Sequence, residues 1–130
     1  MECRFHHVAL KVKDFDGCVQ FYKDVLGLRE KIAWDMDGVP AIMLEMADGG
    51  IVELFGDGPT AEEASSRWLH LAVLVDDVPG TYKKALDCGA KTHIEPAVVD
   101  IPGKSSKMKV EIAFVKGLGG EILEFFKVLG

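Results

Sequence analysis

Residues 7–12 read His-Val-Ala-Leu-Lys-Val, and residues 70–75 read His-Leu-Ala-Val-Leu-Val. In both stretches every second side chain is a Val or Leu, which is the period of a β-strand with one buried face. Each stretch is followed by an aspartate and then by apolar residues at helical spacing, which end at Gly27 and at Gly89. The two stretches lie 63 residues apart, so the sequence predicts an internal duplication.

The remainder of each half predicts three further strands. Glycine- and proline-containing turns separate β-prone runs at 29–34, 41–45 and 51–55, and again at 91–94, 110–115 and 121–126. Asp14 is the expected N-cap of the first helix, and Asp76 or Asp77 that of the second. We therefore expect an α+β fold in which two tandem βαβββ modules form a curved mixed sheet. The expected domain is single, 1–130, with modules at 1–57 and 67–130. The polar linker 58–66 joins them, and a short helical turn is possible at 61–65.

Composition narrows the classes of partner. A formal charge of −6 without a block of Lys and Arg argues against nucleic acid and against an anionic membrane, which leaves a small molecule. No apolar run approaches the ~20 residues that span a bilayer. Three cysteines without C-x-x-C spacing and the lack of a signal-peptide pattern favour the reducing cytoplasm. A module of about 60 residues buries little surface alone, so the modules share their sheets or exchange them with a second chain, and we expect a homodimer.

Four residues form the candidate metal site. His7 and His70 begin equivalent strands, and alternation puts both on the face opposite the apolar residues. The last strand of each half carries a matching carboxylate, Glu53 or Glu124. A carboxylate in so apolar a strand is costly unless it is paired or bound to metal. A lone strand histidine is more often an ordinary hydrogen-bonded side chain, but the equivalence of the two halves favours one divalent ion held by all four residues.

The other histidines, Glu121 and two cysteines are expected to be packing or surface residues without a part in the metal site. By alternation His6 faces the helix side and is expected to be a packing or surface residue, and His93 has no counterpart in the repeat. Glu121 directly follows a turn glycine, where a solvated carboxylate is common. Cys18 and Cys88 lie on or beside helices and are expected to be core or surface thiols.

With these residues in place, the chain resembles the vicinal oxygen chelate superfamily, which includes glyoxalases, bleomycin resistance proteins and extradiol dioxygenases. The most specific segment is Phe-Tyr-Lys-Asp-Val-Leu-Gly-Leu at 21–28, which combines a helix stripe with its glycine stop. The other segments are 7–14, 52–55, 70–77 and 112–115 together with Glu124. The order His, Glu, His, Glu is similar to that of bacterial-type glyoxalase I, the lactoylglutathione lyase.

This resemblance implies a metal-dependent lyase or isomerase. Its substrate would be the hemithioacetal of methylglyoxal and a thiol, converted through an enediolate into a thioester. The implied cofactor is one divalent ion, with Ni or Co favoured and Zn, Mn or Fe possible. Glu53 and Glu124 are implied both as ligands and as the groups that move the proton. Lys11 stands where such lyases commonly have an arginine for the glutathione carboxylate, and Lys109 lies in a segment that resembles their basic loop.

Two other functions within the superfamily stay open. The first is an acyl-CoA epimerase of the methylmalonyl-CoA epimerase type, although such epimerases often have Gln where this chain has Glu53. The second is a drug-binding protein without a metal, with an aromatic-lined groove between chains, to which Trp34 and Trp68 would contribute. Asp57 stands where lyases often have Asn, and its charge would repel an anionic glutathione arm.

Overall fold

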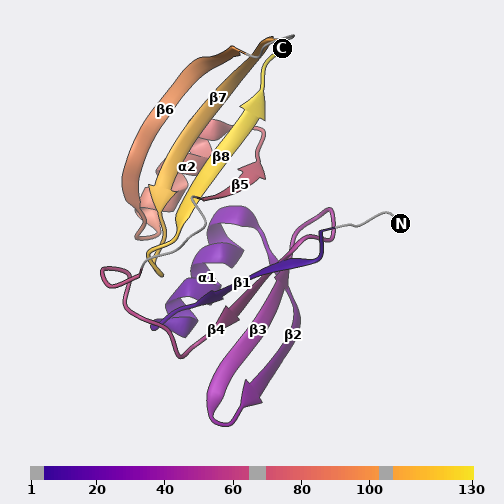
Figure 1. Ribbon diagram of the computed structural model, residues 1–130, viewed down its shortest axis with the longest axis vertical. Coiled ribbons are helices and arrows are strands. Elements are labelled where there is room, and N and C mark those ends of the chain that lie inside the picture. The colour runs from indigo at the N-terminus through magenta and orange to yellow at the C-terminus, as the bar shows by residue number, and fades with distance from the viewer. Residues whose placement is uncertain (1–4, 65–69, 103–106) are drawn as a thin grey trace.

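The computed structural model describes residues 5–64, 70–102 and 107–130, and Figure 1 shows two similar modules that follow one another along the chain. The elements of the first module are β1 (His7–Lys11), α1 (Phe15–Leu26), β2 (Arg29–Met36), β3 (Val39–Glu45) and β4 (Ile51–Phe55). Those of the second are β5 (Leu71–Leu74), α2 (Val78–Asp87), β6 (Lys91–Pro102), β7 (Lys107–Lys116) and β8 (Ile122–Val128). Both modules are βαβββ units, which confirms the α+β prediction.

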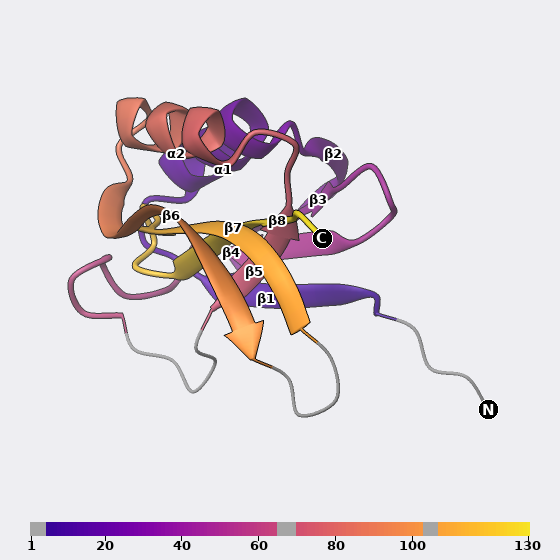
Figure 2. The ribbon, with the colours of Figure 1, turned by 90° about the horizontal axis from the view of Figure 1, so that it is seen from above.

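Each module forms its own four-stranded mixed sheet. The strand orders are β1-β4-β3-β2 and β5-β8-β7-β6, so equivalent strands occupy equivalent places. In each sheet the first and last strands of the module pair in parallel, and the other neighbours pair antiparallel. The two sheets stay open: within the described ranges β1 and β5 are edge strands and do not pair with each other. Seen from above, both helices lie on one side of the strands (Figure 2).

Both helices begin at a capping aspartate three residues before a glycine. The Asp14 carboxylate accepts a hydrogen bond from Gly17 N at 3.1 Å, and Asp77, rather than Asp76, accepts one from Gly80 N at 3.0 Å. Each carboxylate satisfies a backbone donor that the first helical turn leaves without a partner. The cap and the glycine are therefore equally spaced in the two helices.

The second module departs from the predicted boundaries. Helix α2 ends at Asp87 with Cys88 as its cap, one residue before the predicted glycine stop at Gly89. Strand β6 extends to Pro102, well beyond 91–94, because its pairing with β7 continues past two register shifts. Such β-bulges let a strand continue through residues that interrupt regular pairing, and Pro96 lies at the second of them.

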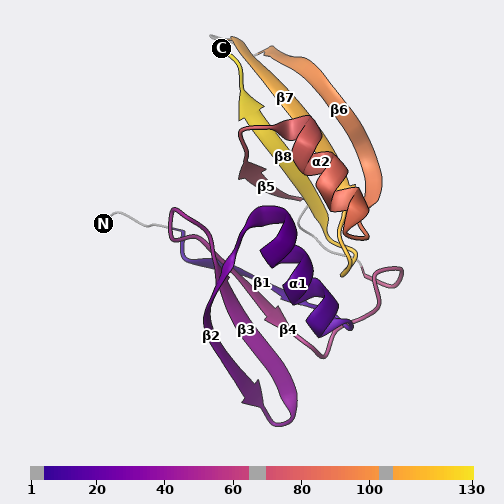
Figure 3. The same ribbon diagram turned by 180° about the vertical axis from the view of Figure 1, so that it is seen from behind.

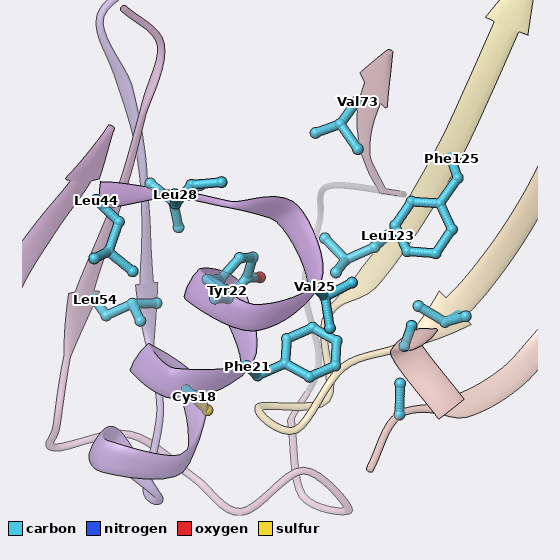
Figure 4. Close-up of a cluster of buried hydrophobic side chains, with 14 of the residues drawn as sticks. Cys18, Phe21, Tyr22, Val25, Leu28, Leu44, Leu54, Val73, Leu123 and Phe125 are labelled. Atoms are coloured by element: carbon cyan, nitrogen blue, oxygen red, sulfur yellow. The ribbon is translucent and has the colours of Figure 1, made fainter. Parts of the chain in front are cut away.

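One hydrophobic core joins the two modules. Helices α1 and α2 contact each other, and Figure 3 shows them side by side in front of the strands. Phe21 and Val25 of α1 belong to the same buried cluster as Leu123 and Phe125 of β8 (Figure 4). Because this core occupies the helix side of both sheets, the polar residues that alternate with the core residues lie on the opposite faces, together with further apolar side chains.

The turn before β8 makes a second junction between the modules. The hydroxyl of Tyr22, on α1, is fully buried and donates a hydrogen bond to Glu121 Oε2 at 2.5 Å. Glu121 Oε1 accepts another from Gly119 N at 3.0 Å. The prediction of a solvated Glu121 is therefore wrong. The turn folds back onto the first module and carries this carboxylate to a buried hydroxyl 99 residues away in sequence.

Burial raises the pKa of Glu121, and the hydrogen bonds from Tyr22 and Gly119 oppose the increase only in part. The folded protein thus holds this proton more tightly than the unfolded chain does. The resulting stabilisation is complete below the unfolded pKa and is lost as the pH rises through the folded pKa. We expect Glu121→Gln, which keeps an acceptor oxygen but does not titrate, to gain stability relative to wild type as the pH rises from the ordinary pKa of a glutamate through the raised pKa of the folded protein.

Denaturant unfolding of both proteins at a series of pH values measures this difference. Glu62→Gln, at an exposed glutamate of the linker, is the matched control and should follow the wild type throughout. A difference between Glu121→Gln and wild type that stays constant with pH would contradict the assignment of the titration to Glu121.

Candidate metal centre

The first predicted pair meets on the open face of the first sheet. Strands β1 and β4 pair in parallel with Ala9 opposite Glu53, and His7 lies on the same face two residues before Ala9. His7 Nε2 lies 3.6 Å from Glu53 Oε1. Glu53 is only 7% exposed, whereas the histidine remains accessible. A nearly buried carboxylate next to an accessible imidazole presents two donor groups on the open face, and we call this candidate pair the first half-site.

The second pair repeats this arrangement in the other module. Ala72 of β5 lies opposite Glu124 of β8, and His70 directly precedes β5 on the same face. His70 Nε2 lies 3.0 Å from Glu124 Oε1, and Glu124 is 8% exposed. Burial raises the pKa of Glu124, and the adjacent imidazole opposes this change. The two pairs are thus equivalent in register, contact and burial.

One chain keeps the two pairs apart. Over residues 5–64, 70–102 and 107–130 there is no group of three or more His, Cys, Asp or Glu residues close enough to hold a metal ion. The donor chemistry itself suits a divalent ion, since each pair offers one imidazole nitrogen and one carboxylate oxygen. Two such pairs must face each other to supply four ligands.

Aromatic rings lie next to both pairs. On the first sheet the ring of Trp34 meets that of Phe55 edge to face, with centroids 6.2 Å apart. Phe55 shares its face with Glu53, two residues away on β4. On the second sheet Phe114 lies opposite Glu124 in the strand pairing, and its ring is 5.1 Å from that of His70. Each half-site therefore combines a polar pair with an apolar wall.

The two predicted substrate-binding lysines have different surroundings. Lys11 lies on the His7 face and its ammonium is 3.6 Å from Asp57 Oδ2, so the acidic residue that the sequence pointed to partly neutralises it. Lys109 lies on β7, five residues before Phe114, and pairs with Asp100 of β6. Strand alternation puts it on the face opposite Glu124, so the structure does not bring it to the second pair. Trp68 lies outside the described residues.

The sequence analysis did not predict the contacts of two residues near the pairs, His6 and His93. His6 is exposed, as expected of a surface residue, but its Nδ1 lies 2.9 Å from Nδ1 of His7, so one imidazole donates to the other. His93 packs its ring 6.2 Å from Phe114. Adjacency to His7 was the available signal for His6. The sequence offered no such signal for His93, because the position of its side chain depends on a β-bulge.

The two cysteines within the described residues, Cys18 and Cys88, do not join either pair. Cys18 is buried on α1, and burial raises the pKa of its thiol to about 12, with a smaller contribution from the negative charge of Glu121. Such a thiol is a core residue and not a nucleophile at neutral pH. Cys88 is partly buried at the end of α2. Both agree with the prediction of ordinary core or surface thiols.

Together these features define a duplicated βαβββ protein with one His–Glu pair on the open face of each sheet. The model of the Glyoxalase/Bleomycin resistance protein/Dioxygenase superfamily matches residues 4–107. The chain belongs to this superfamily, as its resemblance predicted. It is also 28% identical over 131 residues to the uncharacterized protein YwbC of Bacillus subtilis, covering 98% of this chain and 99% of that protein. None of the helices in the described ranges is long and apolar enough to cross a membrane.

Solved structures share the fold. A glyoxalase I mutant from Zea mays superposes with a TM-score of 0.74 at 22% identity, covering 95% of this chain and 44% of the maize chain. A mutant of the fosfomycin resistance protein FosX from Listeria monocytogenes, complexed with Mn(II) and 1S,2S-dihydroxypropylphosphonic acid, gives a TM-score of 0.68 at 15% identity. It covers 96% of this chain and 90% of that one. The superfamily therefore includes enzymes and members that bind a divalent metal.

Proposed function

We propose that this protein is a metal-dependent lyase or isomerase of the glyoxalase I type, which acts in the cytoplasm as a homodimer. It would convert a hemithioacetal of methylglyoxal and a thiol into the thioester. The observation that carries the proposal is the pair of equivalent His–Glu contacts, His7 with Glu53 and His70 with Glu124, on open sheet faces. A protein that only bound an apolar ligand would have no chemical need for two nearly buried carboxylates beside imidazoles.

The separation of the two pairs within one chain supports a dimeric assembly. Because one chain offers two half-sites that do not meet, we propose that the first half-site of one copy faces the second half-site of the other. A twofold dimer would then form two identical four-ligand sites. Exposed apolar side chains on the open faces support such a contact, including Ile32 at 53% exposure and Leu74 at 78%.

The proposed reaction moves one proton between adjacent carbons. A divalent ion held by His7, Glu53, His70 and Glu124 would polarise the substrate carbonyl and stabilise the negative charge that develops on its oxygen. The Glu124 carboxylate, whose pKa burial raises, takes the proton from one carbon. The same carboxyl group then returns this proton to the neighbouring carbon, and Glu53, which is equivalent in register, can carry out this transfer in its place. The aromatic wall of each half-site excludes water from the substrate.

Thioester absorbance tests the reaction. We expect purified protein loaded with Ni or Co to form thioester from methylglyoxal and glutathione, and metal-free protein to form none. Glu124→Gln keeps the size of the side chain but loses the base, so its turnover should fall by at least about 100-fold, the usual contribution of a general base. Its metal content is measured in parallel. Full activity with full metal content in Glu124→Gln would remove this residue from both proposed roles.

The Lys11–Asp57 contact predicts how the protein handles an anionic thiol. If Lys11 binds a substrate carboxylate, Asp57 competes with that carboxylate for the Lys11 ammonium. Asp57→Asn should therefore lower KM for the glutathione adduct by about two- to five-fold, with kcat unchanged. This fold-change corresponds to the energy of a surface ion pair. Asp16→Asn, at an exposed aspartate of α1, makes the same charge change away from Lys11 and should leave KM alone. An unchanged KM in Asp57→Asn would mean that Lys11 does not contact the substrate anion.

The edge-to-face pair of Trp34 and Phe55 favours one alternative, a drug-binding protein of the bleomycin-resistance type. Such a protein would bind a flat apolar ligand, quench tryptophan fluorescence on binding, and do so equally well with and without metal. Metal-independent binding together with absent thioester formation would favour this alternative over the lyase.

A further inference from the structure

His93 occupies an unusual position in strand β6. Thr92 pairs with Val115 and Ile94 pairs with Phe114, so His93 is an extra residue with no partner of its own on β7. A second register shift follows between Ile94 and Ala97. Bulges of this kind often lie next to functional sites, because they redirect a side chain that regular alternation would send elsewhere.

The bulge directs His93 toward the second half-site. Its imidazole lies against Phe114, with ring centroids 6.2 Å apart, and the same phenyl ring lies 5.1 Å from His70. Phe114 is therefore flanked by two imidazoles. One of them contacts Glu124, and the other, His93, is exposed and has no hydrogen-bond partner among the described residues.

We infer that His93 is a substrate-positioning residue, which hydrogen-bonds a carboxylate on the non-reacting arm of the substrate while the reacting oxygens bind next to the His70–Glu124 pair. The inference rests on the proposed function, because it takes the second half-site as the place where those oxygens bind. An imidazole can donate from a ring nitrogen, and Phe114 gives the carbon chain between the two ends an apolar surface. The inference thus assigns to the substrate a carboxylate separated from its reacting end by a short apolar chain.

Two chelators that differ by this carboxylate test the inference without catalysis. Acetohydroxamate presents two adjacent oxygens to a metal, and the monohydroxamates of malonic, succinic and glutaric acid add a carboxylate at increasing reach. The full chain is loaded with Co(II), and its visible absorption is titrated with each compound. We expect one of the three acids to bind about tenfold more tightly than acetohydroxamate, the gain typical of a hydrogen bond to a charged group.

Variants assign that gain to His93. In His93→Phe the ratio of the affinity for the preferred acid to that for acetohydroxamate should fall to near one, while the affinity for acetohydroxamate itself stays the same. His93→Gln keeps a hydrogen-bond donor and should retain part of the preference. Thr92→Val is the matched control: it changes the neighbouring residue, which hydrogen-bonds Tyr82 on the helix side at 2.7 Å, and should keep the full preference.

The outcomes separate this inference from the lyase reaction. A preference that survives His93→Phe, or a wild-type protein that binds all four chelators equally, overturns the role of His93. A protein that discriminates through His93 but forms no thioester supports the inference and refutes the reaction. A protein whose Co(II) spectrum responds to none of the chelators has no such site, and the inference then fails together with the proposed metal centre.

Discussion

His7→Ala and His70→Ala are each expected to abolish metal binding and activity alone, and to restore both when the two variants are co-expressed. Loss of a ligand should weaken metal binding by more than about 100-fold, because outer-shell changes alone cost 10- to 100-fold. In a dimer whose sites combine the first half-site of one copy with the second of the other, the mixed dimer has one site with both substitutions. Its other site keeps all four ligands.

Two different affinity tags isolate the mixed dimer, and its cobalt content and thioester formation are then measured. We expect about one metal per mixed dimer, against about two per wild-type dimer. Co-expression of His7→Ala with Glu53→Gln is the matched control. Both substitutions fall in the first half-site, so each site of that mixed dimer lacks a ligand. Equal loss in the two mixed dimers would show that the ligands are not shared between copies.

The duplication explains why the candidate ligands could be predicted without a structure. Strand alternation and the 63-residue register identified His7, Glu53, His70 and Glu124 as candidate ligands, and the structure finds a His–Glu contact within each module, at 3.6 Å and 3.0 Å. Alternation is a local property of the chain, and an internal repeat allows the prediction for one half to be checked against the other half. The relation between the two pairs is not local, since it depends on how the modules are arranged, and neither the period nor the register contains that information.

The sequence did not predict the surroundings of Glu121, His93 or Lys109. The role of Glu121 follows from a glycine turn that folds back onto Tyr22 of the other module, which a strand pattern cannot express. His93 was given no role because it has no counterpart in the repeat, and the bulge that directs it interrupts the regular alternation of β6. Lys109 was assigned from resemblance to a basic loop, whereas it lies within a strand whose alternation puts it on the other face. The wrong prediction for Glu121 therefore arises where the modules meet, and His93 lies where strand pairing departs from regularity.

Gly120→Ala is expected to be the most destabilising single methyl addition in the turn before β8. Gly120 has φ +88°, where a side chain is strained, and a Cβ there would lie 2.4 Å from the carbonyl oxygen of Ala61 and 2.7 Å from Cβ of Ala64. Both contacts belong to the segment between the modules. The backbone strain should cost about 1–2 kcal/mol, and the clash adds about 1–3 kcal/mol because the neighbours include main-chain atoms.

Gly38→Ala separates these two costs. Gly38 has nearly the same φ, +86°, but an added Cβ would meet nothing within 4 Å. Denaturant unfolding should therefore give a loss of about 1–2 kcal/mol for Gly38→Ala and a clearly larger one for Gly120→Ala. Equal losses would mean that the segment at Ala61 yields without cost and does not hold the turn in place. A larger loss at Gly120 would show that the turn and this segment are held together, which fixes β8 and Glu124 relative to the first module.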